Sequence, residues 1–277
     1  MRERTGIMLA YKFDPKRLSR LSLPYITQPK LNGDRCRAVF SPSGEVTLLS
    51  STAREILSVP HINRALEHLG LKNLELDGEL YIHGMSHQQI RSIASKRVTL
   101  HPEYLKMQYH VYDLVSPEPQ LARLETLQKI NTKEVSDHIK LVPAWYLTNL
   151  DQIKSTYTSL LNSGYEGVVI RDPNSPYIRK QTTKLLKLKP RLSMTCIITG
   201  FEEEHTITGE PKGTLGSLQV QDTEGNTFHV GTGFTQRQRL NMWQIKDTLK
   251  GQKAKIRYQE LSDDMIPKMA SFDCLIN

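Results

Sequence analysis

The sequence predicts an α+β fold followed by a small, mostly β barrel, and three observations support this prediction. Residues 1–190 alternate between short apolar runs with strand spacing and longer segments with helical spacing. After Pro190 the sequence changes to short strands separated by glycine-containing turns, with one helical stretch. The length of 277 residues suffices for one large and one small domain. We therefore expect two domains, residues 1–190 and 191–277.

Strands are predicted in the first domain where short apolar segments are bounded by turn residues. The first two are expected to form a hairpin, because residues 41–44 carry the Ser, Pro and Gly that favour a turn. The predicted strands are 35–40, 45–49, one within 73–83, 109–114, 167–171 and 185–188.

Helices are predicted where apolar residues recur at helical spacing. Gly164 follows the last of these segments, in the position that a helix C-terminus favours for glycine. The stretch around residues 101–102 is expected to be irregular. The predicted helices are 60–69, 88–95, 121–131 and 149–163.

The second domain has a different pattern, with strands predicted at 195–202, 216–221, 227–231 and 254–261 and a helix at 235–250. About five strands and one helix in so short a segment fit a small Greek-key barrel of the oligonucleotide-binding (OB) kind.

The charge is positive and unevenly distributed. The net charge is +8, and residues 1–190 hold 27 lysines and arginines against 18 acidic residues. Residues 191–277 hold 10 lysines and arginines against 11 acidic residues. Excess positive charge attracts polyphosphates and nucleic acid, although a solvated basic surface is the plain alternative.

Several classes of protein are excluded by composition. The apolar runs are far shorter than the roughly 20 residues of a membrane span, and the amino terminus carries no secretory pattern. Three cysteines without CxxC spacing argue against a disulfide framework or a structural zinc site and favour a reducing cytoplasm. His83 and His87 have i, i+4 spacing but no HExxH motif, so we do not expect a histidine metal site.

Five short motifs follow one another along the first domain. Each is weak alone, since a lysine in a turn, a strand-end acid and an aromatic on a strand all have ordinary structural roles. Strand alternation places Lys187 and Lys189 of the last motif on the same face. The motifs are Gln-Pro-Lys-Leu-Asn-Gly-Asp-Arg at 28–35, Leu-Glu-Leu-Asp-Gly-Glu-Leu at 74–80, Val-Tyr-Asp-Leu at 111–114, Glu-Gly-Val-Val-Ile-Arg at 166–171 and Leu-Leu-Lys-Leu-Lys at 185–189.

In this order the motifs resemble those of the ATP-dependent DNA ligases, which belong with RNA ligases and mRNA capping enzymes to the covalent nucleotidyltransferases. The family motifs KxDGxR, DGE, an aromatic strand, EGxxxR and LLKxK match these segments, and residues 213–219 and 230–235 resemble the ligase OB domain. The resemblance implies an ATP-grasp-like nucleotidyltransferase (adenylation) domain over 1–190, followed by a small OB-fold β-barrel over 191–277.

The resemblance also implies roles in adenylyl transfer. Lys30 would attack the α-phosphorus of ATP and form a covalent lysyl-AMP. Lys187 and Lys189 would lower the pKa of Lys30 and neutralise charge on the phosphates. Glu79 and Glu166 would bind Mg²⁺, which usually takes one or two carboxylates.

Further residues are implied around the nucleotide and the nick. Tyr112 would stack on adenine, and Gln28 would lie near the exocyclic amine. Arg35 would contact the nucleotide and hold the 5′-phosphate of the nick, a bidentate task suited to guanidinium. Arg171 and Arg179 are candidates for phosphate contacts or for a solvated face.

Three departures from the family pattern stand out. Asn32 occupies the place of the usual Asp, and Asp34 is a candidate substitute. Arg54 lies three residues after Ser51, where the family commonly has Ser-Arg. The basic terminal motif is reduced to residues 267–272. We expect Asn32 and Arg54 to bind nucleic acid together with Arg35.

The function implied is a minimal ATP-dependent DNA ligase that seals 3′-OH/5′-phosphate nicks in duplex DNA through lysyl-AMP and a DNA-adenylate. We expect a cytoplasmic monomer, bacterial or in a phage-infected cell, acting in DNA replication, repair or recombination without a membrane partner. The alternatives are an RNA ligase or capping-type nucleotidyltransferase, and a nick-binding protein with weakened catalysis, which Asn32 keeps open.

Overall fold

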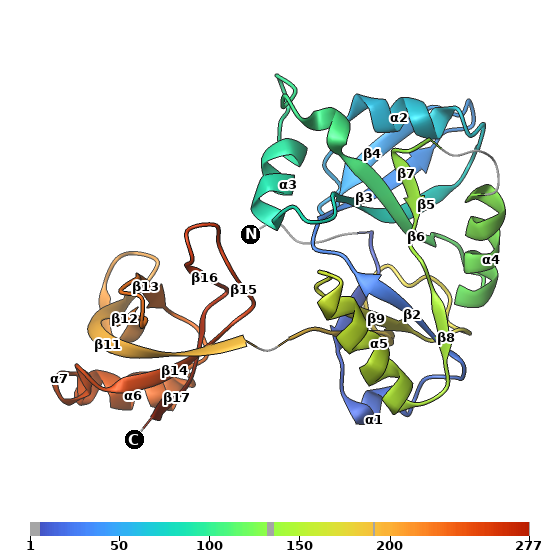
Figure 1. Ribbon diagram of the computed structural model, residues 1–277. Helices are drawn as coiled ribbons and strands as arrows, with labels where there is room; N and C mark the ends of the chain where they lie inside the picture. Colours follow the sequence, from blue (N-terminus) through green and yellow to red (C-terminus); the bar gives the residue numbers. More distant parts are fainter. Residues whose placement is uncertain (1–5, 132–135, 191, 277) are drawn as a thin grey trace. The chain divides into compact units, whose positions relative to one another are not determined.

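The structure, a computed structural model, describes residues 6–131, 136–190 and 192–276 (Figure 1). The chain divides into two compact units, Met1–Lys189 and Pro190–Asn277. Both units combine strands with helices, which confirms the predicted α+β class. No helix in these described ranges is long and apolar enough to cross a membrane.

The first unit contains two five-stranded sheets. In the first sheet the strand order is β1 (Leu9–Lys12), β10 (Gln181–Leu188), β9 (Gly167–Arg171), β2 (Tyr25–Lys30) and β8 (Trp145–Leu147). In the second sheet it is β4 (Val46–Ser50), β3 (Asp34–Phe40), β5 (Glu75–Tyr81), β6 (Gln108–Leu114) and β7 (Ile139–Leu141).

The helices of the first unit begin at residues that suit helix N-termini. Prolines occupy the first turns of α1 and α2, Ser86 forms a capping box with Gln89 at α3, and Asn149 caps α5. The predicted helices are confirmed with small shifts at their ends. The helices are α1 (Pro15–Leu18), α2 (Pro60–Glu67), α3 (His87–Ala94), α4 (Gln120–Asn131) and α5 (Leu150–Asn162), with a 3-10 turn at Tyr104–Lys106.

Strand β2 was not predicted from the sequence, although it carries Lys30. Its Pro29 cannot donate a ladder hydrogen bond, which argues against a central strand. The pairing of β2 with its neighbours shows why Pro29 is tolerated. Strand β8 pairs only with Tyr25, Ile26 and Thr27, so Pro29 has a partner strand, β9, on one side alone.

Each sheet of the first unit has its own apolar core. One core lies between the second sheet and helices α2 and α3, and the other includes Ile153 and Leu160 of α5 beneath the first sheet. Tyr165 packs against both cores and directly precedes Glu166. The segment that carries Glu166 is therefore held at the junction of the two sheets.

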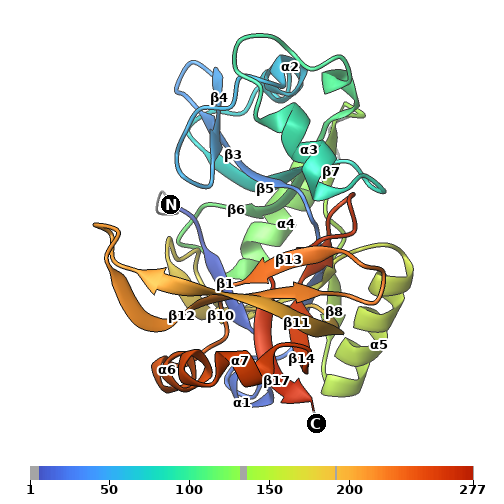
Figure 2. The same ribbon diagram turned by 90° about the vertical axis from the view of Figure 1, so that its left-hand side faces the viewer.

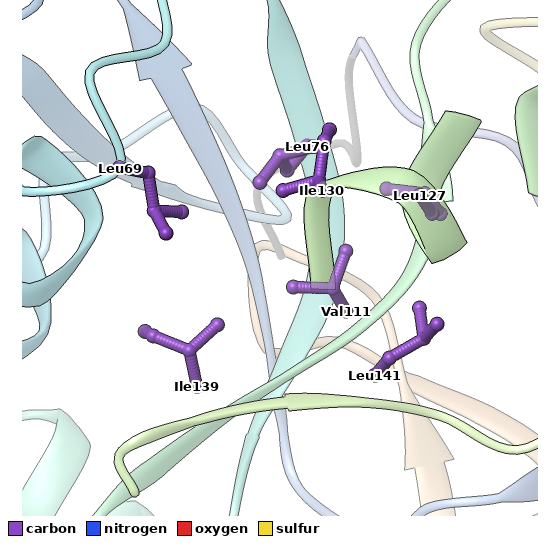
Figure 3. Close-up of a pocket in the computed structure, with 7 residues that line it drawn as sticks. All are labelled: Leu69, Leu76, Val111, Leu127, Ile130, Ile139 and Leu141. Carbon is purple, nitrogen blue, oxygen red and sulfur yellow. The ribbon is translucent and has the colours of Figure 1, made fainter. Parts of the chain in front are cut away.

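A small apolar cavity of about 20 Å³ lies in the first unit (Figure 3). Val111 of β6 projects into it, whereas the hydroxyl of Tyr112, the unpaired residue of a bulge in β6, lies 3.5 Å from the carboxylates of Asp77 and Glu79. The lining is wholly apolar, so the cavity offers no partner for a polar ligand. Its lining residues are Leu69, Leu76, Val111, Leu127, Ile130, Ile139 and Leu141.

The second unit is built on a five-stranded antiparallel sheet (Figure 2). The predicted helix 235–250 is interrupted at Ile245, and β11 is longer than expected. Arg239 of α6 donates hydrogen bonds to the carbonyls of Leu215, Gly216 and Gly231, which fixes the helix on the sheet. In sheet order the strands are β13 (Thr227–Val230), β12 (Pro211–Gln221), β11 (Leu192–His205), β14 (Lys253–Tyr258) and β17 (Ser271–Ile276), accompanied by α6 (Gln236–Gln244), α7 (Lys246–Leu249) and the short pair β15 (Glu260–Leu261) and β16 (Pro267–Lys268).

A buried ionic network connects both sheets of the first unit with α4. Arg123 is fully buried, and its Nε donates to Asp113 Oδ1 at 2.8 Å. Arg171 Nη1 donates to Asp113 Oδ2 at 2.7 Å, and Arg171 Nε donates to Gln28 Oε1, also at 2.7 Å. One carboxylate therefore compensates two guanidinium groups from β9 and α4.

We predict that Asp113→Ala lowers the free energy of unfolding by about 3–5 kcal/mol, because it leaves two buried cations without their carboxylate. Urea unfolding of the full chain measures the change. The matched control is Asp137→Ala, at a fully exposed acid, which should stay within about 0.5 kcal/mol of the parent. Equal stability of the two variants would contradict the role of the network.

Candidate active site

The backbone brings Lys30 and Glu166 together. Lys30 ends β2 opposite Gly167, the first residue of β9, and the Glu166 amide donates to the Lys30 carbonyl at 3.1 Å. Gly167 has φ +149°, and a Cβ there would lie 2.2 Å from the Leu188 carbonyl oxygen. Only glycine permits this close approach, which places Glu166 beside Lys189 at the end of β10.

Glu166 holds two lysines at once. Its Oε2 forms an ion pair with Lys30 Nζ, and its Oε1 accepts from Lys189 Nζ at 3.1 Å. Burial raises the pKa of Glu166, but the two lysines outweigh it and hold the pKa below its ordinary value. Glu166 is therefore an anion that fixes the position of both ammonium groups.

Glu79 approaches the same region from the second sheet. It lies within β5, whereas the sequence indicated a position where a strand meets a turn. A Cβ on Gly33 would lie 2.2 Å from the Leu80 carbonyl oxygen and 2.8 Å from Glu79 Cγ, so glycine lets the segment after Lys30 pack on β5. Burial raises the pKa of Glu79 to about 7, against the opposing charges of Lys30 and Arg35.

Tyr112 lies on β6 next to these carboxylates. Its hydroxyl is 3.5 Å from both Asp77 Oδ1 and Glu79 Oε2. The guanidinium carbons of Arg35 and Arg171 lie 5.6 and 5.5 Å from the ring centroid, within cation–π range. The aromatic ring thus belongs to the same cluster as the first two motifs.

Arg35 is held by protein acceptors. Its Nε donates to Asp77 Oδ1 at 3.0 Å, its Nη2 pairs with Asp77 Oδ2, and its Nη1 donates to the Met8 carbonyl at 2.7 Å. The Tyr177 hydroxyl donates to Asp77 Oδ2 at 2.6 Å and accepts from the Met8 amide at 3.0 Å. This arrangement fixes the plane of the Arg35 guanidinium.

Asp77 and Tyr177 are site components that the sequence reasoning missed. Asp77 lies inside the DGE motif and could have been identified as the partner of Arg35 from that position. Tyr177 offers no comparable signal, because the hydrogen bonds of its hydroxyl with Met8 and Asp77 join segments 100 or more residues apart in the chain.

The side chains of Gln28, Arg171 and Arg179 form hydrogen bonds with other groups of the protein. Gln28 is buried; its Oε1 accepts from Arg171, and its Nε2 donates to the Tyr112 carbonyl at 3.4 Å. Arg171 is 4% exposed, so it lies in the buried network and not on a solvated or phosphate-facing surface. Arg179 pairs with Glu75 and also donates to the Gly6 carbonyl.

The departures from the family pattern occupy different places. Asp34 Oδ1 accepts from Arg91 Nη1 at 2.9 Å and faces His87 Nε2 at 3.4 Å, so its carboxylate is committed to α3 and does not substitute for Asn32. Asn32 is half-buried, two residues after Lys30. Arg54 is exposed in the turn after β4, and its amide donates to Ser50 Oγ at 3.1 Å.

The remaining candidates are Lys187 and the two carboxylates proposed to bind a cation. Lys187 lies on β10 opposite Val169 of β9, two residues before Lys189. Within the described ranges, no group of three or more His, Cys, Asp or Glu side chains is placed to hold a metal ion. Glu79 and Glu166 still offer hard oxygen donors, which fit a cation that keeps most of its ligands as water and phosphate.

The fold and this cluster together define a nucleotidyltransferase domain and an OB-fold domain. Residues 7–189 match the family described as ATP dependent DNA ligase domain, and residues 208–275 match the DNA ligase OB-like domain. The chain therefore belongs to the ATP-dependent DNA ligase family.

Curated relatives include DNA ligases of viral and bacterial origin. The chain is 29% identical over 190 residues to the DNA ligase of African swine fever virus (isolate Pig/Kenya/KEN-50/1950), covering 64% of this chain and 44% of the viral protein. It is 25% identical over 198 residues to the DNA ligase of Haemophilus influenzae, covering 71% and 70%. The chain spans less than half the length of the viral relative.

Solved structures share the fold. A structure from a structure–function study of DNA binding with a minimal scaffold by Lig E DNA ligases has a TM-score of 0.78 at 20% identity, covering 98% and 99% of the two chains. The structure described as Pmar-Lig_PreS3 has a TM-score of 0.85 at 22% identity, covering 99% of this chain and 68% of the other.

We predict that Glu79→Gln stabilises the protein at pH 8 by on the order of 1–3 kcal/mol, with a gain that vanishes towards pH 4.5. A carboxyl whose pKa is raised to about 7 by burial costs stability when it ionises, so the cost grows as pH rises between these values. Thermal unfolding at several pH values measures it.

The matched control is Glu125→Gln at an exposed position on α4, where stability should change little at any pH. A Glu79→Gln variant that is less stable than the parent at pH 8 would contradict the raised pKa of Glu79. So would a stability difference between variant and parent that is the same at every pH.

Proposed function

We propose that this chain is an ATP-dependent DNA ligase that seals 3′-OH/5′-phosphate nicks in duplex DNA. The observation that carries the proposal is the Glu166 carboxylate shared by Lys30 and Lys189 where β2, β9 and β10 meet. In a chain of the ATP-dependent DNA ligase family, this places a positioned lysine beside further cations, as adenylyl transfer requires.

The first step is attack by the Lys30 amine on the α-phosphorus of ATP. A bond forms between Nζ and phosphorus, the bond to the bridging oxygen breaks, and pyrophosphate leaves. The Lys30 ammonium first gives one proton to water, since only the neutral amine has a free electron pair, and the nitrogen gives a second proton to water as the phosphoramidate forms. Lys187 and Lys189 then provide positive charge where negative charge increases on the phosphates.

Two further transfers complete sealing. AMP moves from Lys30 to the 5′-phosphate of the nick, and the 3′-hydroxyl then displaces AMP to form the phosphodiester. Arg35, whose guanidinium is oriented by Asp77, is proposed to hold the 5′-phosphate. Asn32 and Arg54 are proposed to bind the nucleic acid. We assign adenylation to residues 1–190 and an OB domain to residues 191–277.

The adenine is proposed to stack on Tyr112. Gln28 lies close to this region, and its hydrogen bonds connect Arg171 to the Tyr112 backbone. We therefore propose that Gln28 lies near the exocyclic amine of adenine and fixes the position of Tyr112 relative to β2. Truncating it would disturb adenine stacking as well as the buried network.

Glu79 and Glu166 are the residues that would hold Mg²⁺. When bound, the cation supplies positive charge to the phosphates and favours the neutral form of a nearby amine. The half-buried setting of Glu79 and its pKa of about 7 mean that its charge depends on pH near neutrality. We further propose a monomer that acts on nicked duplex DNA in the cytoplasm.

We predict that Lys30→Ala abolishes transfer of label from ATP labelled at the α-phosphate to the protein, while the fold is retained. Lys30 is the proposed nucleophile, and its Nζ forms the ion pair with Glu166 Oε2. Lys16→Ala, at an exposed lysine on α1, is the control and should label normally. Persistent labelling of Lys30→Ala would remove Lys30 from its role.

A chase with nicked DNA or RNA then separates the candidate functions. Label that passes to nicked duplex DNA, with closure of the nick, supports the ligase. Discharge to RNA alone would favour an RNA ligase or capping enzyme. Absence of label in protein stripped of bound AMP would favour a nick-binding protein.

We predict that Asn32→Asp keeps nick sealing unchanged or makes it faster. The change restores the carboxylate that the family commonly has at this position, and Asp34 does not provide one because it is bound to α3. Single-turnover sealing by adenylated protein measures the effect. A loss of sealing would show that this site is adapted to an amide.

A further inference from the structure

His83 is an exposed histidine that contacts the segment leading to Glu166. It lies two residues after the end of β5, the strand of Glu79. Its Nδ1 lies 2.9 Å from the Tyr81 hydroxyl, and its ring contacts that of Tyr165, with centroids 4.8 Å apart and planes inclined by 48°. The imidazole therefore connects the end of β5 with the residue directly before Glu166.

Tyr81 fixes the imidazole on the second sheet. The Tyr81 side chain is buried at the end of β5, and burial raises the pKa of Tyr81 to about 12, so the hydroxyl keeps its proton and can donate to His83 Nδ1. The Tyr81 ring also contacts His110 of β6 edge to face, with 5.2 Å between the centroids. Two neighbouring strands thus determine where His83 lies.

The segment that His83 contacts is fixed at both of its ends. Gly164 and Tyr165 close helix α5 as a Schellman motif, in which their amides donate to carbonyls of the last helical turn at 3.0 Å. At the other end, the Glu166 amide donates to the Lys30 carbonyl. A Cβ on Gly164 would lie 3.7 Å from His83 Cε1 and Nε2, so the imidazole lies within van der Waals range of this segment.

We infer that His83 is a positioning residue for the transfer of AMP to Lys30, and that it acts by holding Tyr165 and the adjoining Glu166 in place. Glu166 pairs with Lys30 Nζ, so a displaced Glu166 also displaces the nitrogen that we propose as the nucleophile. An error of about 1 Å in such a geometry can cost about 10²-fold in rate. The inference rests on the proposed function and adds to it a residue that lies in none of the five motifs.

The variants His83→Ala and His83→Phe test this inference, because only phenylalanine retains a ring against Tyr165. Transfer of label from ATP labelled at the α-phosphate is followed in single turnovers over a range of ATP concentrations. His83→Ala should lower the maximal rate by about 5- to 20-fold and leave the half-saturating ATP concentration within about 2-fold, since the change misplaces Lys30 without removing a nucleotide contact. His83→Phe should recover most of the rate.

Two further measurements separate this effect from a general loss of structure. The urea midpoint of both variants should equal that of the parent, because the histidine is exposed. Hydrogen–deuterium exchange of the Glu166 amide, measured without nucleotide, should be faster in His83→Ala than in the parent and in His83→Phe. The matched control is His68→Ala, at an exposed histidine after α2, which should label and exchange like the parent.

A parental maximal rate in His83→Ala, a His83→Phe variant as slow as His83→Ala, or a loss of rate that follows a lowered urea midpoint would each overturn the inference. So would a raised half-saturating ATP concentration at an unchanged maximal rate, which would mean that His83 contributes to nucleotide binding. Failure of the parent to label with AMP would overturn the proposed function instead. Unchanged exchange of the Glu166 amide in His83→Ala would overturn the inference whether or not the parent labels.

Discussion

The geometry of the site depends on one carboxylate. Glu166 accepts from Lys30 on one oxygen and from Lys189 on the other, and it can do so because Gly167 lets the start of β9 approach the end of β10. The interaction restrains a long lysine side chain that would otherwise sample many rotamers, so the nitrogen that we propose as the nucleophile is positioned before any nucleotide binds. It also gathers positive charge where phosphates would lie. The proposed nucleophile and the lysine proposed to stabilise the phosphates thus lie at the same strand ends.

Buried ion pairs orient side chains next to this arrangement. Asp113 compensates Arg123 and Arg171, and Arg171 in turn orients Gln28 on the strand that ends at Lys30. Asp77 performs a similar task for Arg35, with the Tyr177 hydroxyl on its second oxygen. Such pairs add little net stability compared with apolar packing, but breaking one is costly. Their benefit here is geometric, since each fixes a functional side chain from a different strand.

The sequence predicted helices α2 to α5 and most strands from the spacing of apolar residues. Its ordered motifs singled out Lys30, Glu166 and Lys189, which lie together in the structure. It did not predict β2, since Pro29 argues against a central strand and only the register with β8 shows why it is tolerated. The sequence left open whether Asp34 substitutes for the usual Asp at position 32. In the structure the Asp34 carboxylate binds Arg91 and faces His87 of α3. The sequence reasoning missed Tyr177, whose contacts join distant segments. Long-range pairing of this kind depends on tertiary packing, which leaves no local pattern in the chain.

The most direct test of the account is peptide mapping of the protein after incubation with ATP and Mg²⁺, by tandem mass spectrometry under conditions that preserve phosphoramidates. The account predicts one added AMP per chain, located on Lys30. AMP on Lys187 or Lys189 would mean that Glu166 positions a different nucleophile, and it would contradict the central assignment.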